Sequence, residues 1–225
     1  MMLFKRIFVI ACSLLIVDNT KASDYLNQLE HNIESIKVIR VSNKSYPPIL
    51  LGIVTRLPAN TNAKDADLVT FTHEGTHFLC RGAADNKHAI YIDNGKRVLL
   101  PIPPIKTLKL FNSIPLKERG SIYNTYKSQG NHRYWQSRPT MVIEEWIAYT
   151  HGSIARQQLK LQDRSESDRY CAIMANYCWH LIKLCEQANW GKTNSLIEFC
   201  EWNNERCAEE IPNWKQLFDK RFKTF

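Results

Sequence analysis

The chain has 225 residues, of which 44% are hydrophobic and 23% are charged. These fractions are ordinary for a folded protein and exclude a largely disordered chain, and the length suffices for one full hydrophobic core. The formal net charge is +8, but the basic residues are scattered and form no long run, so we expect no nucleic acid among the partners.

Residues 1–22 have the pattern of a secretory signal peptide. Two basic residues precede an apolar run over 7–17, and small residues follow from Ala22. A run of this length is too short to cross a bilayer. We therefore expect cleavage after Ala22, a secreted or periplasmic location and no stable membrane anchor afterwards. A tetrapeptide that ends at Cys12 is similar to a lipoprotein box, although the apolar run continues past it.

The next elements are predicted from periodicity and from residues that break it. Apolar residues at helical spacing indicate an amphipathic helix over 23–39. Two prolines followed by β-branched and leucine residues indicate a short strand over 45–57. A polar connector over 60–66 leads into a helix from about 65 to 80, which Gly82 is placed to end.

Beyond this helix the period changes. Apolar residues alternate over 88–102 around Asn94-Gly95, a strong two-residue hairpin turn. The segment 101–139 is irregular and rich in aromatic residues, and Thr140 is placed to cap a helix over 141–161. We expect an α+β fold that is mainly helical, with a small hairpin or sheet next to the helix over 65–80.

Two further helices are predicted over 167–188 and 194–211, and cysteines recur on them every seven residues. Seven residues make about two helical turns, so each set lies along one face. In an exported chain we expect disulfides; small buried residues on a helical face are the alternative, and a metal cluster is disfavoured because no Cys-x-x-Cys pair occurs. An antiparallel hairpin favours the pairs Cys185–Cys200 and Cys178–Cys207, and the two cysteines left over would form Cys80–Cys171. Residues 161–225 would thus form a disulfide-stapled hairpin packed on a core formed by 23–160.

The segment that suggests chemistry is His73-Glu74-Gly75-Thr76-His77. Residues four apart on a helix lie one above the other, so His73 and His77 can present two imidazoles to one tetrahedral zinc ion. Glu74 lies about 100° round the helix, where it can act as general base toward a water molecule on the ion. Gly75 is unfavourable inside a helix unless another segment packs closely against it.

A third protein ligand is expected from the later helix, which offers Glu144, Glu145 and His151. The helical faces do not decide which of the two glutamates is the ligand. Both could instead be solvated and bind no metal. The motif together with Glu145-Trp146-Ile147-Ala148 resembles the gluzincin metallopeptidases. This resemblance implies that Glu145 is the ligand and that Glu144 either supports the ligands from behind or faces solvent. Those families usually place the two helices closer than the 68 residues that separate His77 from Glu145. Either the hairpin and the aromatic segment are an insertion, or the chain is a remote branch of the group.

The resemblance implies a zinc metallopeptidase in which His73, His77 and Glu145 bind Zn²⁺, Glu74 is the general base and the substrate is a peptide or protein. The pattern of residues 1–22 implies that this enzyme is exported. Such an enzyme needs a donor for the oxyanion, and we favour His132 and Tyr149. The other candidates are Tyr123, Tyr126, Tyr134 and His151.

Two alternatives stay open. The chain could be a non-enzymatic exported binding protein, or a zinc amidase acting on cell-wall bonds. His31, His88 and His180 have no informative spacing and are expected to be structural.

Overall fold

The computed structural model describes residues 33–39, 42, 44–58, 67–80, 86–161 and 166–222, without the side chains of 219–222. The expected signal peptide, the polar connector and Gly82 lie outside these residues. All described residues belong to one unit, Asn32–Phe225. The unit is mainly helical with one small sheet, which confirms the expected α+β class. None of the described helices combines the length and the apolar character needed to span a membrane.

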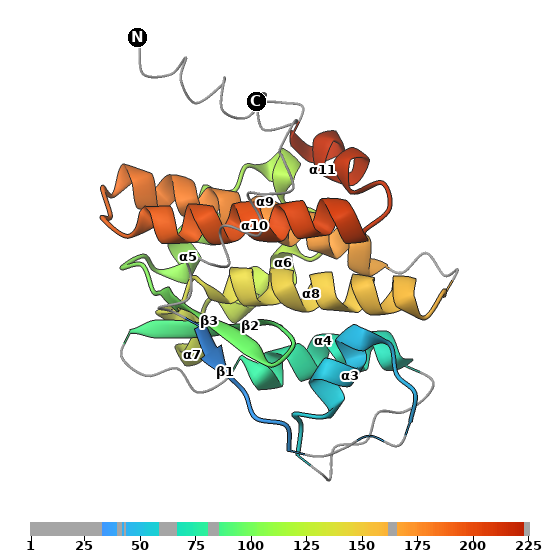
Figure 1. The fold of residues 1–225 in the computed structure, drawn as a ribbon. Coiled ribbons are helices and arrows are strands. Elements are labelled where there is room, and N and C mark those ends of the chain that lie inside the picture. The colour runs from blue at the N-terminus through green and yellow to red at the C-terminus, as the bar shows by residue number, and fades with distance from the viewer. Residues whose placement is uncertain are drawn as a thin grey trace. The chain divides into compact units, whose positions relative to one another are not determined.

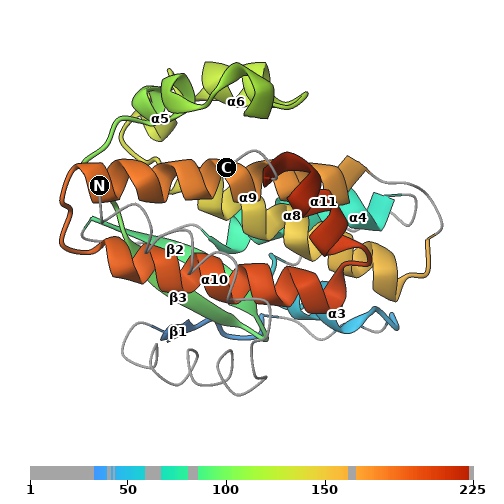
Figure 2. The same ribbon diagram turned by 90° about the horizontal axis from the view of Figure 1, so that it is seen from above.

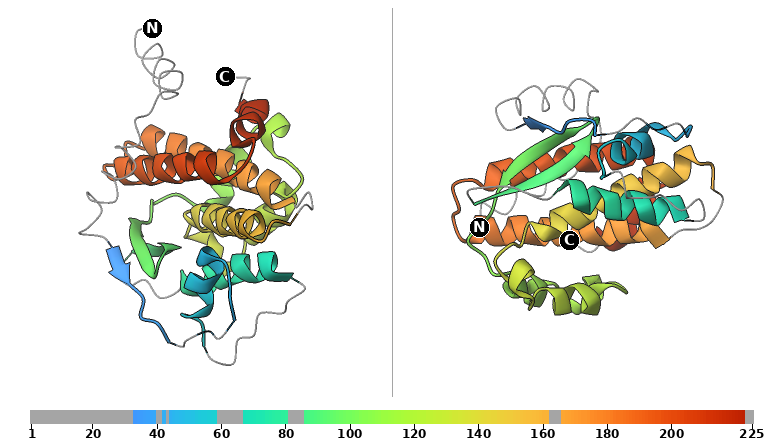
Figure 3. Two further views of the ribbon diagram at one scale, coloured as in Figure 1. Left: turned by 45° about the vertical axis from the view of Figure 1, so that its right-hand side comes forward. Right: turned by 90° about the horizontal axis from the view of Figure 1, so that it is seen from below.

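The central element is helix α8 (Met141–Gln158). It packs most extensively against α9 (Glu166–Gln187) on one side and α4 (Leu68–Leu79) on the other. Figure 1 shows α9 and α10 (Thr193–Glu210) above α8, with α3 (Pro48–Val54) and α4 below it, and the left view of Figure 3 shows the same order. Because neighbours surround α8, almost every side chain along it is buried, and this includes two adjacent glutamates.

The sheet contains the predicted hairpin. Strands β2 (Lys87–Asp93) and β3 (Lys96–Pro101) are antiparallel and joined at Asn94-Gly95, where φ is 43° and 78°. Positive φ at both positions is the geometry that favours an Asn-Gly pair in such a turn. A third strand, β1 (Ile33–Ser35), pairs with the free edge of β3, so the order is β1-β3-β2. β2 packs on α4 and α8, which fixes the sheet beside the motif helix.

Two predictions for the N-terminal part are wrong where the structure describes it. Residues 33–39 are not helical: 33–35 form β1, because the edge of β3 offers backbone hydrogen-bonding groups to them. Residues 48–54 form helix α3 rather than a strand. Pro48 at the first helical position suits a helix start, and the buried residues recur at helical spacing. They are Ile49, Leu50, Ile53 and Val54.

The segment 101–139 is more ordered than predicted. It forms α5 (Thr107–Ser113), a single 3-10 turn (Leu116–Glu118), α6 (Tyr123–Gln129) and α7 (Arg133–Gln136). In Figure 2, α5 and α6 lie alongside α9, on the side away from α10. A further helix that sequence patterns did not indicate, α11 (Trp214–Phe222), follows α10.

The helices α9 and α10 agree with prediction, but the disulfides do not. All six cysteines among the described residues are free and buried. α9 ends at Gln187 and α10 begins at Thr193, so the centre of the turn lies earlier in the sequence than the predicted pairs require. Each cysteine of α10 therefore faces the cysteine of α9 that lies seven residues before its predicted partner. Cys171 now faces Cys207 at 3.8 Å between sulfurs, and Cys178 contacts Cys200. The pairs Cys185–Cys200, Cys178–Cys207 and Cys80–Cys171 are therefore wrong, and small buried residues on a helical face describe these cysteines correctly.

Candidate metal centre

Helix α4 begins and packs in a way that fixes the direction of its histidines. The Asp67 side chain caps it by accepting a hydrogen bond from the Thr70 backbone N–H at 3.1 Å. Gly75 lies against α3: a Cβ there would be 2.5 Å from Cγ2 of Ile53. The close approach explains why glycine occupies this helical position despite its cost of about 1 kcal/mol. With Gly75 turned toward α3, the two motif histidines face α8.

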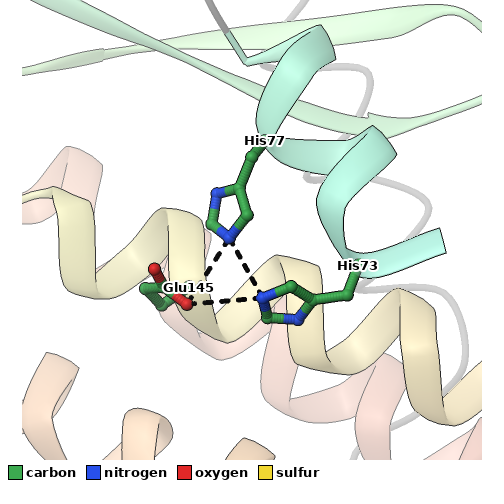
Figure 4. Close-up of side chains that lie close together, drawn as sticks. All are labelled: His73, His77 and Glu145. Carbon is green, nitrogen blue, oxygen red and sulfur yellow. Dashed lines mark hydrogen bonds and ion pairs between the residues drawn. The ribbon is translucent and has the colours of Figure 1, made fainter. Parts of the chain in front are cut away.

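Three side chains meet where α4 crosses α8 (Figure 4). His73 and His77 point their Nε2 atoms toward each other at 3.1 Å. Oε2 of Glu145 lies 3.6 Å from Nε2 of His73 and 3.5 Å from Nε2 of His77. A tetrahedral zinc ion with bonds of about 2.0–2.1 Å holds its donors about 3.3–3.4 Å apart. The three donor atoms therefore already form a triangle of the size that one zinc ion needs.

Glu144 lies behind this triangle rather than in it. Its Oε1 accepts a hydrogen bond from Nδ1 of His77 at 2.7 Å, and its Oε2 lies 2.5 Å from Nε2 of His88. Nδ1 of His88 in turn lies 2.9 Å from the Thr140 hydroxyl. Both glutamates are buried, which excludes the alternative that they are simply solvated. Thr140 does precede α8, but its side chain makes no capping bond there because it turns to His88.

Two tyrosines support the other ligands. The Tyr126 hydroxyl donates a hydrogen bond to Oε2 of Glu145 at 2.8 Å and lies 2.9 Å from the Tyr149 hydroxyl. The Tyr149 ring packs on the His73 ring, with 4.4 Å between centroids. Tyr149 is thus at the site, as its candidate role requires, and burial raises its pKa to about 12, so its hydroxyl keeps its proton at neutral pH.

The histidines differ in protonation although they are neighbours on one helix. Burial, and then the charge of His77, lower the pKa of His73 to about 4. Burial would also lower the pKa of His77, but hydrogen bonds to Glu144 and Glu145 outweigh it and raise that pKa to about 10. Burial opposes ionisation of Glu144, yet hydrogen bonds from His77 and His88 lower its pKa to about 2. Without a metal, His77 is therefore the charged imidazolium at neutral pH, with a proton on each ring nitrogen, while His73 is neutral.

The other candidate site residues, Glu74, His132 and His151, differ in how far they are exposed to solvent. Glu74 is exposed on α4, close enough to Tyr149 for its charge to raise the pKa of that hydroxyl. His132 is exposed at the start of α7. His151 is fully buried, with Nδ1 2.9 Å from the Thr76 hydroxyl and Nε2 2.7 Å from a backbone carbonyl of β2, so it ties α8 to its neighbours.

Sequence reasoning missed His88 and left Tyr126 among several candidates. One signal for His88 was present: in the predicted strand it shares a face with Ile90 and Ile92, where an apolar residue was expected. A polar residue on an inward strand face needs a buried partner, and here that partner is Glu144.

Among the described residues, one group of three histidine, cysteine, aspartate or glutamate side chains is arranged to hold a metal ion. It consists of His73, His77 and Glu145. The side chains of His73, His77 and Glu145 keep 14%, 17% and 9% of their surface exposed, so the site lies close to the molecular surface. In comparisons with known proteins, no family model matches the chain, and neither a curated protein nor a solved structure matches it.

Proposed function

We propose that the chain is a zinc-dependent metallopeptidase of the gluzincin type that hydrolyses peptide bonds. The observation that supports this proposal most is the triangle of His73, His77 and Glu145, whose donor atoms lie 3.1 to 3.6 Å apart. Export is proposed as well, from the leader-like sequence of residues 1–22 alone.

The donor set suits zinc by its chemistry as well as its size. Two imidazole nitrogens and one carboxylate oxygen are the protein ligands of many catalytic zinc sites, which leave the fourth position open. Two of the three ligands are also held from behind by hydrogen bonds, His77 by Glu144 and Glu145 by Tyr126. Such outer contacts orient ligands before the metal arrives. Zinc would polarise the substrate carbonyl and acidify a water molecule at the site.

The chain's own residues would supply the proton transfers. The exposed carboxylate of Glu74, beside His73 in sequence, would take a proton from the attacking water and later deliver it to the nitrogen of the leaving amine. The Tyr149 hydroxyl, oriented by Tyr126, would donate a hydrogen bond to the carbonyl oxygen as negative charge develops on it. Tyr149 is preferred to His132 for this role because its ring already contacts His73.

The decisive comparison is between the purified wild-type chain and Glu74→Gln. Zinc content is measured by mass spectrometry, and hydrolysis is measured on a library of peptides with defined sequences. We expect about one zinc per chain in both proteins and hydrolysis in the wild type alone, reduced in the variant by about 10²–10⁴-fold, the usual contribution of a general base.

Glu209→Gln is the matched control, because Glu209 is also an exposed helical glutamate but lies on α10, which provides none of the three donors. It should hydrolyse peptides like the wild type. A wild-type chain that binds no zinc would overturn the proposal. A chain that binds zinc but is equally inactive toward peptides with Glu74 present or replaced would retain the metal site and overturn the peptidase.

A further inference from the structure

The histidine that sequence patterns did not single out, His88, lies in a buried chain of hydrogen bonds that ends at the metal centre. The chain runs from Thr140 through His88 and Glu144 to His77, with separations of 2.9, 2.5 and 2.7 Å. His88 is 2% exposed and Glu144 is 4% exposed. A buried carboxylate between two imidazoles would be costly to leave unpaired, so each member of this chain depends on the next.

The donors and acceptors in this chain can all be satisfied in one direction. A threonine hydroxyl can donate to Nδ1 of a neutral His88, which leaves Nε2–H of His88 to donate to Oε2 of Glu144. The other oxygen of Glu144 then accepts from Nδ1–H of His77. A metal ion that displaces the second ring proton of His77 would find the remaining proton held on Nδ1 by Glu144 and the lone pair of Nε2 directed toward His73 and Glu145.

We infer that His88 is a positioning residue for the metal centre, acting through Glu144 to fix the ring orientation and tautomer of His77. Thr140 is the end of the same hydrogen-bonded chain that lies farthest from the metal centre. The inference rests on the proposed zinc site. It extends that proposal, because it gives the segment between α4 and α8 a function in supporting the metal ligands.

The strand gives His88 a rigid base. His88 pairs with Leu100 across the hairpin, and the four residues after it, Ala89 to Ile92, are all buried against neighbouring elements. β2 also packs directly on both α4 and α8. The hairpin therefore holds its histidine at a fixed height along α8. The segment between α4 and α8 thus supplies His88 from β2, which holds Glu144, and Tyr126 from α6, which holds Glu145.

The test compares His88→Phe, which removes both ring nitrogens, with His88→Gln, whose amide can still donate near the place of Nε2. Affinity for zinc is measured by competition with a chelator, and the site is also observed through the absorption bands of bound cobalt(II). We expect His88→Phe to weaken zinc binding by about 10–100-fold, the range found for outer contacts of metal ligands, and to shift the cobalt bands. His88→Gln should restore most of the affinity.

A matched control is His180→Phe. His180 is also a buried histidine paired with a buried glutamate, with 2.7 Å between Nε2 and Oε2 of Glu118, but it lies on α9. Its replacement should disturb the fold to a similar extent and leave the affinity for zinc and the cobalt bands unchanged. Equal losses in the two phenylalanine variants would reduce His88 to a structural residue and overturn the inference.

If His88→Phe does not fold, Thr140→Val decides, because it removes the hydroxyl and keeps the shape. It should weaken zinc binding by a few-fold, and unchanged affinity would overturn the inference. A wild type that binds zinc while His88→Phe binds it equally well overturns the role of His88 and leaves the proposed function standing. A wild type that binds no zinc overturns both.

Discussion

The contact between α4 and α8 and the contact between α9 and α10 were both predicted from residues spaced along single helices, and they turned out differently. At the first contact, His73 and His77 share a face and meet Glu145 with donor atoms 3.1 to 3.6 Å apart. At the second, the cysteines also share a face, yet the predicted partners do not meet, and the described sulfurs form no disulfide.

The difference shows what spacing along a helix can predict. Helical spacing fixes which side chains share a face, because it depends on local geometry alone. It does not fix the position along the helix axis at which a second helix packs. Two imidazoles on one helix need only one carboxylate from the partner, and α8 offered two adjacent candidates. Two rows of cysteines need the correct register along their whole length, and a small shift of the turn changes every pair.

The largest expected effect is on the affinity for zinc, and it should occur at the contact between α4 and α8 but not at the contact between α9 and α10. His77→Ala removes a donor from the triangle and should reduce zinc affinity by more than the 10–100-fold typical of outer contacts. Cys178→Ala, at the other contact, should leave zinc affinity unchanged, because Cys178 faces Cys200 rather than the metal centre. Both are measured by chelator competition. If the cysteine variant lost zinc as well, the two regions would not be independent.

The next effect concerns pH and applies to the metal centre alone. The pKa of His77 is raised to about 10 in the metal-free protein, while that of His73 is lowered to about 4. Between about pH 6 and 9, zinc must therefore displace one proton, from His77, and its affinity should rise by about tenfold per pH unit. Calorimetry in two buffers of different ionisation enthalpy should find about one proton released. A pH-independent affinity in this range would contradict the assigned protonation.

A smaller effect concerns the packing that orients α4. Gly75→Ala would place a Cβ 2.5 Å from Ile53 and should lower the free energy of unfolding by about 1–3 kcal/mol, partly offset by the better helix propensity of alanine. Gly152→Ala is the matched variant on α8, where the nearest atom to the new Cβ, in Val69, is 3.6 Å away. It should stabilise the protein by up to about 1 kcal/mol. Denaturant unfolding measures both, and a reversed order would contradict the packing described for α4.

A comparison of two serine variants concerns the contact between α9 and α10, where the difference between them is the smallest effect expected. Cys178→Ser would bury a hydroxyl among apolar neighbours and should destabilise the fold by about 1–3 kcal/mol. Cys171→Ser should cost less, because its sulfur lies 3.3 Å from the Thr150 hydroxyl, which can pair with the new one. Thermal unfolding of the two variants, with Cys→Ala at each position for reference, checks the order. Equal losses would contradict the polar surroundings assigned to Cys171.

Prediction from sequence succeeded where the signal was local. The motif helix, the turn at Asn94-Gly95, the α8 helix and the α9–α10 hairpin each follow from short-range periodicity or turn chemistry. It failed where tertiary contacts decided. Residues 33–35 form a strand because β3 has a free edge, and 48–54 form a helix once their apolar face can pack on α4.

The candidate site divides in the same way. His73, Glu74 and His77 could be named from one motif, and the resemblance to gluzincins indicated Glu145 before Glu144. His88 and Tyr126 could not be assigned, because each reaches the site from a separate element across a long stretch of sequence. Their roles depend on the heights at which β2 and α6 meet α8, and no spacing within either element reports those heights.

The most direct test of the central claim is a crystal structure of the zinc-loaded protein with anomalous scattering measured at the zinc edge. We predict one ion within about 2.0–2.2 Å of Nε2 of His73, Nε2 of His77 and Oε2 of Glu145, with Glu144 still hydrogen-bonded to Nδ1 of His77. An anomalous peak at any other place, or zinc bound by Glu144 in place of Glu145, would contradict the account.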